Sequence, residues 1–137
     1  MKLKSLVRVG AFVTCLAVTS SLVFAATIPD RKIANYNLFI PRLGGNAYTE
    51  PLLKVSTESG VNRNTSTGAS KTVYSTICKG TSNVTGEIKT TSGSRVIIPY
   101  NQGQNIKDLN YRLMMETSLF ETVTVQAQGS WSPDLAP

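Results

Sequence analysis

Three tyrosines are the residues best suited to bind a ligand in this chain of 137 residues: Tyr48, Tyr74 and Tyr100. A tyrosine ring offers an apolar face for stacking, and its hydroxyl group can donate or accept a hydrogen bond. Two polar stretches, residues 60–70 and 101–110, carry Ser, Thr, Asn and Gln side chains that could hydrogen-bond to a glycan. These residue types predict recognition of a ligand without its chemical conversion.

The nucleophilic and acidic residues form no catalytic pattern. The sequence has no histidine, which excludes Ser-His-Asp and Cys-His catalysis and most zinc sites. Thr76 and Lys79 have the spacing of a Ser-x-x-Lys dyad but would face opposite sides of a strand. Glu116 and Glu121 come nearest to a glycosidase pair, and each falls on the polar side of its strand. We therefore expect no enzyme activity, no cofactor and no metal.

The first 25 residues have the order of a secretory signal peptide. Lys2, Lys4 and Arg8 precede an apolar stretch over about residues 9–24, and Val23 and Ala25 supply β-branched and small side chains at the −3 and −1 positions of a cleavage site. That arrangement predicts export and cleavage after Ala25. The mature protein would then be secreted and extracellular, without a membrane span. Residues 26–32 would form a short flexible leader.

Removal of the signal peptide changes both the charge and the cysteine content. Three of the 14 basic residues lie in it, so 11 basic and 8 acidic residues would remain, a net charge near +3. The basic residues are spread singly, which argues against a nucleic-acid partner. Cys15 would be removed, leaving Cys78 without an intramolecular partner. Because free cysteine is usually buried, we expect Cys78 in the core, with an intermolecular disulfide as the alternative.

Short runs rich in Thr, Val, Ile and Tyr, separated by turn residues, predict an all-β domain over residues 33–137. We expect about seven short strands in an antiparallel β-sandwich, with a partly closed barrel as the alternative. Residues 84–91 and 95–100 read as a hairpin, and the small polar residues 58–70 as a mobile loop. The seven expected strands cover residues 33–40, 52–57, 71–79, 84–91, 95–100, 111–119 and 120–131.

Trp131, the only tryptophan, ends the clearest alternating run of the chain. Val123, Val125, Ala127 and Gly129 share its parity, so the five residues would face the core together. Gly129 would leave room beside the indole ring. We expect Trp131 to close one end of the core; the alternative is an exposed ring that holds a sugar or a lipid headgroup.

The signal peptide, two short motifs near the start of the domain and the closing Gly-Ser-Trp-Ser-Pro-Asp at 129–134 carry a resemblance. The two early motifs are Leu-Phe-Ile-Pro at 38–41 and Gly-Asn-Ala-Tyr-Thr at 45–49. Together they resemble small secreted β-rich proteins of Gram-positive bacteria, largely uncharacterised, of which some are bacteriocin-associated. The resemblance implies no catalytic residues, and it favours an antimicrobial role.

Three functions fit these observations. The first is a secreted, non-enzymatic binding protein that acts at a cell surface or envelope, with an envelope glycan or a surface protein as its partner. Tyr48, Tyr74, Tyr100 and the two polar stretches would form its contacts. The second is a bacteriocin-like antimicrobial protein, and the third is a small enzyme inhibitor that presents one of those stretches.

Overall fold

The computed structural model describes residues 30–135. The expected signal peptide at 1–25 and the first residues of the expected leader lie outside the described residues. Within them no helix is long and apolar enough to cross a membrane. The all-β class is confirmed, but this part of the chain forms ten strands where seven were expected. The elements are β1 (Ala34–Ile40), β2 (Asn46–Tyr48), β3 (Leu52–Leu53), β4 (Gly60–Thr67), the 3-10 turn η1 (Gly68–Ser70), β5 (Val73–Lys79), β6 (Ser82–Asn83), β7 (Ile88–Thr90), β8 (Ser94–Ile98), β9 (Asn110–Thr117) and β10 (Val125–Ser132).

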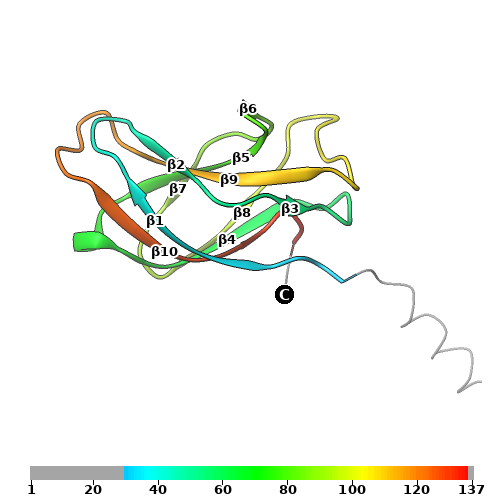
Figure 1. Cartoon of the computed structure of the whole chain (residues 1–137), viewed down its shortest axis with the longest axis horizontal. Coiled ribbons are helices and arrows are strands. Elements are labelled where there is room, and N and C mark those ends of the chain that lie inside the picture. Colours follow the sequence, from blue (N-terminus) through cyan, green and yellow to red (C-terminus); the bar gives the residue numbers. More distant parts are fainter. Residues whose placement is uncertain (1–29, 136–137) are drawn as a thin grey trace, which may run out of the picture. The chain divides into compact units, whose positions relative to one another are not determined.

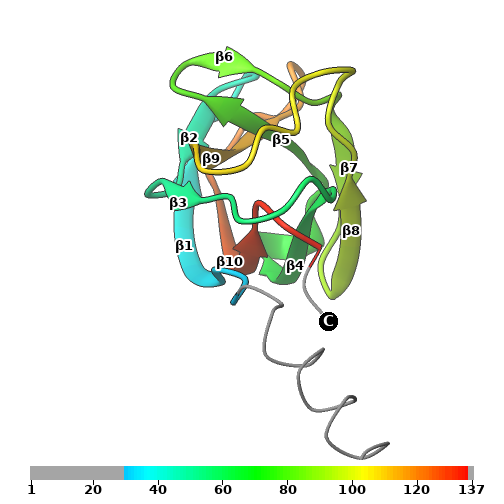
Figure 2. The same cartoon turned by 90° about the vertical axis from the view of Figure 1, so that its right-hand side faces the viewer.

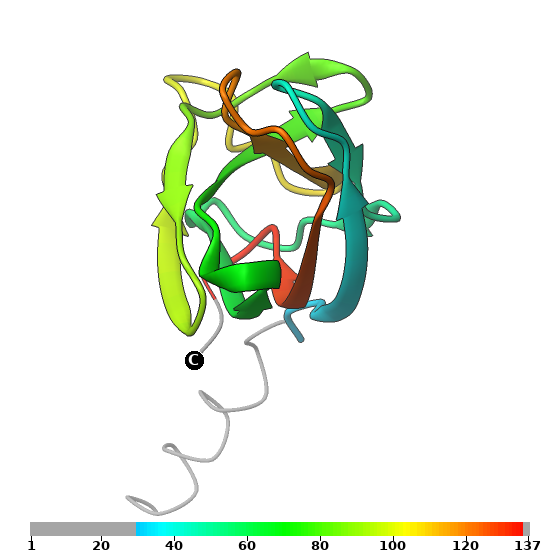
Figure 3. The same cartoon turned by 90° about the vertical axis from the view of Figure 1, so that its left-hand side faces the viewer.

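The strands form two antiparallel sheets in a sandwich-like arrangement (Figure 1). The first sheet has four strands in the order β1-β10-β4-β8. The second has the order β2-β9-β5-β6, with β3 also paired to β9 and β7 to β5. Views from the two ends show the sheets enclosing one interior (Figures 2 and 3). Inward-facing residues of the longer strands, such as Tyr36 and Ile40 of β1 and Val125 and Ala127 of β10, fill that interior, as expected when two half-polar sheets pack face to face.

Trp131 lies in this interior, as predicted, with 1% of its surface exposed. Val125 and Ala127 are buried on the same strand. Val123 is exposed, contrary to its expected inward position, because β10 begins only at Val125. Gly129 was expected to leave room beside the indole ring, but its neighbours across the strands are Arg63 and Tyr36. A Cβ atom there would collide with the Arg63 carbonyl oxygen and would lie 2.7 Å from the Tyr36 hydroxyl oxygen.

Strand β4 corrects the expectation of a mobile loop at residues 58–70. Its inward positions include Asn62 and Asn64, and neither side chain is exposed. The Tyr36 hydroxyl group donates to the Asn62 side-chain oxygen at 2.8 Å, and the Asn62 amide donates to the Ser75 hydroxyl oxygen at 2.9 Å. The Asn64 amide donates to the Thr91 carbonyl oxygen. Buried amides with partners thus take the place of apolar side chains in this strand.

The expected hairpin of residues 84–91 and 95–100 is wrong. Strand β7 pairs with β5 in the second sheet, and β8 pairs with β4 in the first. The short turn between them carries the chain from one sheet to the other. Its Gly93 has a φ of 75°, a conformation that residues with a Cβ atom rarely adopt.

The expected strand at residues 52–57 ends at Leu53, because Lys54 and the residues after it turn toward Asp134. The Lys54 ammonium group and the Asp134 carboxylate lie 3.1 Å apart, with neither side chain exposed. Asp134 also accepts hydrogen bonds from the Val55 N–H and from the N–H and hydroxyl groups of Ser56. These bonds fix the segment after β10 against the loop after β3.

Candidate functional site

Tyr100 is enclosed by the same buried cluster. Its hydroxyl group donates to the Pro133 carbonyl oxygen at 2.7 Å, and its ring packs edge-on against Tyr111 with 5.5 Å between centroids. The Lys54 ammonium group lies 4.4 Å from the centroid of the ring. Burial raises the pKa of Tyr100. All these contacts are internal, so Tyr100 contributes to packing of the domain.

Tyr48 lies on β2 at the edge of the second sheet and is half-buried. The Arg112 guanidinium group covers its ring at 4.5 Å from the centroid, and the same group donates to the Gly80 carbonyl oxygen at 2.7 Å. One side of the tyrosine therefore already has a stacking partner. The ring also lines a hollow of about 250 Å³ beside β1.

Tyr74 lies on the outer side of β5, between Glu116 of β9 and Lys89 of β7. It lines a hollow of about 290 Å³, here called the Tyr74 hollow. The antiparallel pairing of β5 with β9 places Tyr74 directly opposite Glu116, so their side chains share one face. The residues that line the hollow are Tyr74, Glu87, Glu116, Thr117, Ser118, Leu119 and Phe120. The structure thus keeps the three candidate tyrosines at three separate places.

Exposed apolar side chains form one rim of the Tyr74 hollow. Phe120 is 89% exposed and Leu119 is 72% exposed. Both lie in the loop between β9 and β10, which pairs with the turn between β1 and β2 (Figure 1). The Leu43 N–H donates to the Glu121 carbonyl oxygen at 2.8 Å, which brings the exposed Leu43 to the same end of the domain. Large exposed apolar side chains that gather in this way mark surfaces that contact another molecule.

Two carboxylates give the Tyr74 hollow its negative charge. Partial burial, together with the neighbouring carboxylate of Glu87, raises the pKa of Glu116 above its ordinary value. Glu121, which the sequence suggested as a partner for Glu116, instead forms an ion pair with Lys71 at 3.4 Å. An aromatic ring beside two carboxylates and a serine hydroxyl can stack on an apolar face and accept hydrogen bonds from hydroxyl groups.

Cys78 is buried, as predicted, and its thiol donates to the Asn83 side-chain oxygen at 3.2 Å. Burial raises the pKa of the thiol despite the nearby positive charge of Arg112. A thiol in this state is a poor nucleophile, because the thiolate is the reactive form.

No family model, no curated protein and no solved structure matches the chain. The resemblance to small secreted β-rich proteins of Gram-positive bacteria therefore stays a prediction.

The sequence analysis named Tyr74 as a candidate but did not name the side chains that surround it in the structure. Leu119 and Phe120 were expected inside strands, whereas both lie in the loop after β9. Glu87 and Glu116 are far apart in the sequence, and only the pairing of β5 with β7 and β9 brings them to one face. The adjacent apolar pair Leu119-Phe120, which breaks the alternation of the strand before it, was the one available indication of a loop.

Proposed function

We propose that this protein is a secreted, non-enzymatic binding protein that acts at a cell surface or envelope, and that the Tyr74 hollow is its recognition site. The observation that carries the proposal is the position of Tyr74 and the exposed Phe120 beside Glu87 and Glu116 in one shallow hollow. Tyr74 belongs to a strand paired on both sides, so its position is fixed before a ligand arrives.

An envelope glycan is the ligand that best fits this hollow. Sugar rings have apolar C–H faces that suit an aromatic ring, and their hydroxyl groups donate hydrogen bonds to carboxylates. Glu116 and Glu87 supply acceptors, and the Ser118 hydroxyl supplies a further polar contact at the rim. The antimicrobial role that the resemblance favours would need the same first step, attachment to an envelope.

The test measures binding of the purified protein to solubilised cell-wall glycans by titration calorimetry. Replacing Tyr74 with alanine removes the stacking face, and we expect Kd to rise about tenfold, a loss of about 1.4 kcal/mol. Phe120→Ala should weaken binding in the same direction. Phe39→Ala is the matched control, because Phe39 is also exposed but lies on β1 of the other sheet.

Thermal unfolding of each variant shows whether the fold is retained. A folded Tyr74→Ala variant that binds the glycan as tightly as the parent would contradict the proposal. Equal losses in Phe120→Ala and Phe39→Ala would contradict the location of the site.

A further inference from the structure

The indole nitrogen of Trp131 is buried without a hydrogen-bond partner. The side chain is 1% exposed, and among residues 30–135 its Nε1–H group finds no acceptor. Buried polar groups in folded proteins are almost always hydrogen-bonded, because a donor that leaves water without gaining an acceptor costs stability. A bound molecule that supplied an acceptor would remove this cost.

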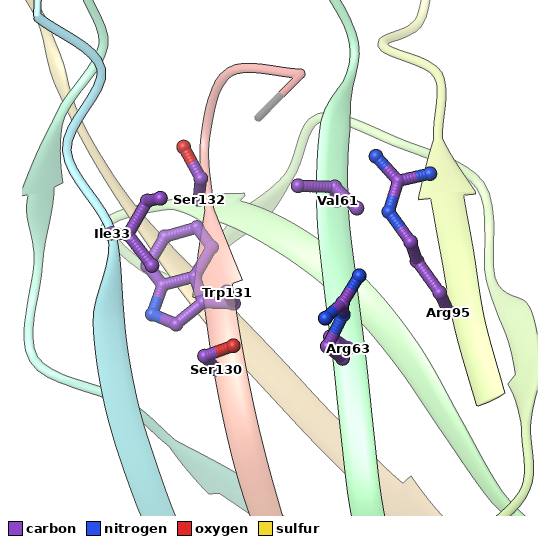
Figure 4. Close-up of a pocket in the computed structure, with 7 residues that line it drawn as sticks. All are labelled: Ile33, Val61, Arg63, Arg95, Ser130, Trp131 and Ser132. Carbon is purple, nitrogen blue, oxygen red and sulfur yellow. The ribbon is translucent and has the colours of Figure 1, made fainter. Parts of the chain in front are cut away.

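Trp131 forms part of the wall of the hollow beside β1 that also contains Tyr48, here called the Tyr48 hollow. Figure 4 shows the indole ring extending from β10 toward β1, with its nitrogen on the side of β1 and away from Arg63. The Tyr48 hollow lies on that same side, because five consecutive residues of β1 line it. The nitrogen therefore points toward the hollow.

The free edge of β1 forms another wall of the Tyr48 hollow. Successive side chains of a strand point to opposite faces, so a hollow lined by residues 34–38 must run along the backbone edge. Among the residues that the structure describes, β1 pairs only with β10. Alternate N–H and carbonyl groups of β1 therefore point away from β10 and toward the hollow, where they can bond to a ligand.

Two side chains restrict the chemistry of that ligand. The Tyr48 ring, which the Arg112 guanidinium group covers on one side, offers an apolar surface. Glu50 is exposed and also lines the hollow, so its carboxylate would repel an anion. A neutral carbonyl oxygen is therefore the acceptor that suits Trp131.

We infer that the Tyr48 hollow binds the acetamido group of an N-acetylated sugar, at a site separate from the Tyr74 hollow and independent of the proposed function. The amide carbonyl oxygen accepts from the Trp131 Nε1–H group, and the amide N–H donates to a carbonyl oxygen at the free edge of β1. The sugar ring packs against Tyr48, and its hydroxyl groups donate to Glu50.

The shape of the hollow favours a compact group over an extended peptide. It reaches no further along β1 than Leu38, because a short turn at residues 41–45 joins β1 to β2 beyond that point. A peptide strand would need a longer open edge to pair with β1 along its whole length.

The first experiment follows the indole N–H resonance of the isotope-labelled, purified protein by NMR as N-acetylglucosamine is added. Trp131 is the only tryptophan, so the spectrum contains a single resonance of this kind. We expect it to move downfield and to saturate, because a new hydrogen bond deshields the proton. Glucose lacks the acetamido group, and potassium acetate has a carboxylate in place of the amide, so both should leave the resonance nearly unchanged.

Tyr48→Ala should raise the Kd for N-acetylglucosamine about tenfold in this titration, because the apolar ring surface is lost. Phe39→Ala serves as the control, because it removes an aromatic ring from β1 that does not line the hollow, and it should bind like the parent. The spectrum of each variant also shows whether the fold is retained. Trp131 stays in place throughout, since its ring packs in the core.

Trp131 does not line the Tyr74 hollow, so its resonance reports on the Tyr48 hollow alone, and failure at one site does not imply failure at the other. An indole resonance that ignores N-acetylglucosamine, that responds equally to glucose, or that responds equally in Tyr48→Ala would overturn the inference. Tighter binding of N-acetylalanine amide than of N-acetylglucosamine would assign the hollow to a peptide and would overturn the assignment to a sugar.

Discussion

At the scale of single residues, Lys54 and Asp134 form an ion pair in which neither side chain is exposed. A buried charge is costly unless every bonding position is satisfied. The Lys54 ammonium group donates to the Glu58 and Pro133 carbonyl oxygens in addition to Asp134. Burial would raise the pKa of Asp134, but the hydrogen bonds from Ser56, Val55 and Lys54 outweigh it, so the pKa lies below its ordinary value of 3.8.

Asp134→Asn should therefore be severely destabilising near neutral pH. It leaves the Lys54 charge buried without its counter-ion, at a cost of about 3–5 kcal/mol in the free energy of unfolding. In the parent, the contribution of Asp134 is complete above the unfolded-state pKa and is lost as pH falls through the lower folded-state pKa. Urea unfolding between about pH 7 and about pH 2 should show the gap between parent and variant closing in acid.

The control for this measurement is Asp108→Asn, which alters an exposed carboxylate in the turn before β9. Its free energy of unfolding should stay within about 0.5 kcal/mol of the parent near neutral pH. A gap between the parent and Asp134→Asn that stays constant over the whole pH range would show that Asp134 does not act as a buried anion.

At the scale of the elements, strand β4 shows which part of the fold sequence patterns could predict. Strands β1, β5, β9 and β10 were expected near their observed positions, because apolar and polar residues alternate along them. Strand β4 has no such pattern, because its fully buried inward positions are asparagines. Only their partners on other strands make those positions internal, and no local rule supplies that information.

Asn62→Ala should test this role of β4. The substitution removes the acceptor of the Tyr36 hydroxyl group and the donor to Ser75, so we expect a loss of about 1–3 kcal/mol in the free energy of unfolding. Ser66→Ala is the control in the same strand, because that side chain is exposed, and it should change the free energy by less than about 0.5 kcal/mol. Denaturant unfolding measures the free energy of unfolding of both variants. Equal values for Asn62→Ala and Ser66→Ala would mean that the buried amide of Asn62 does not stabilise the domain.

The sequence likewise predicted only part of the Tyr74 hollow. Tyr74 could be singled out because its aromatic ring offers an apolar face for stacking. Its neighbours could not, because Glu87 and Glu116 reach it through strand pairing, and Leu119 and Phe120 through a loop.

At the scale of the whole molecule, Cys78 reports on the stability of the entire domain. It has no exposed surface and lies on β5, which pairs with three other strands. We expect iodoacetamide to modify Cys78 only when the domain unfolds, so that the modification rate rises with urea as global unfolding does. Mass spectrometry of the peptide that contains Cys78 measures this rate. Fast modification in the absence of denaturant would show that β5 opens locally.

The pairing of β1 with β10 determines the order in which the domain can be assembled. Among the residues that the structure describes, β1 is the first strand and β10 the last; β1 has one neighbour in its sheet, β10, and β10 also separates β1 from β4. A chain emerging from the ribosome therefore cannot complete the first sheet until residues 125–132 have left the exit tunnel. Such distant contacts slow folding, because the intervening chain must be ordered before the contacts form. A growing chain would therefore expose the unpaired edges of β1 and β4 until the end of its synthesis.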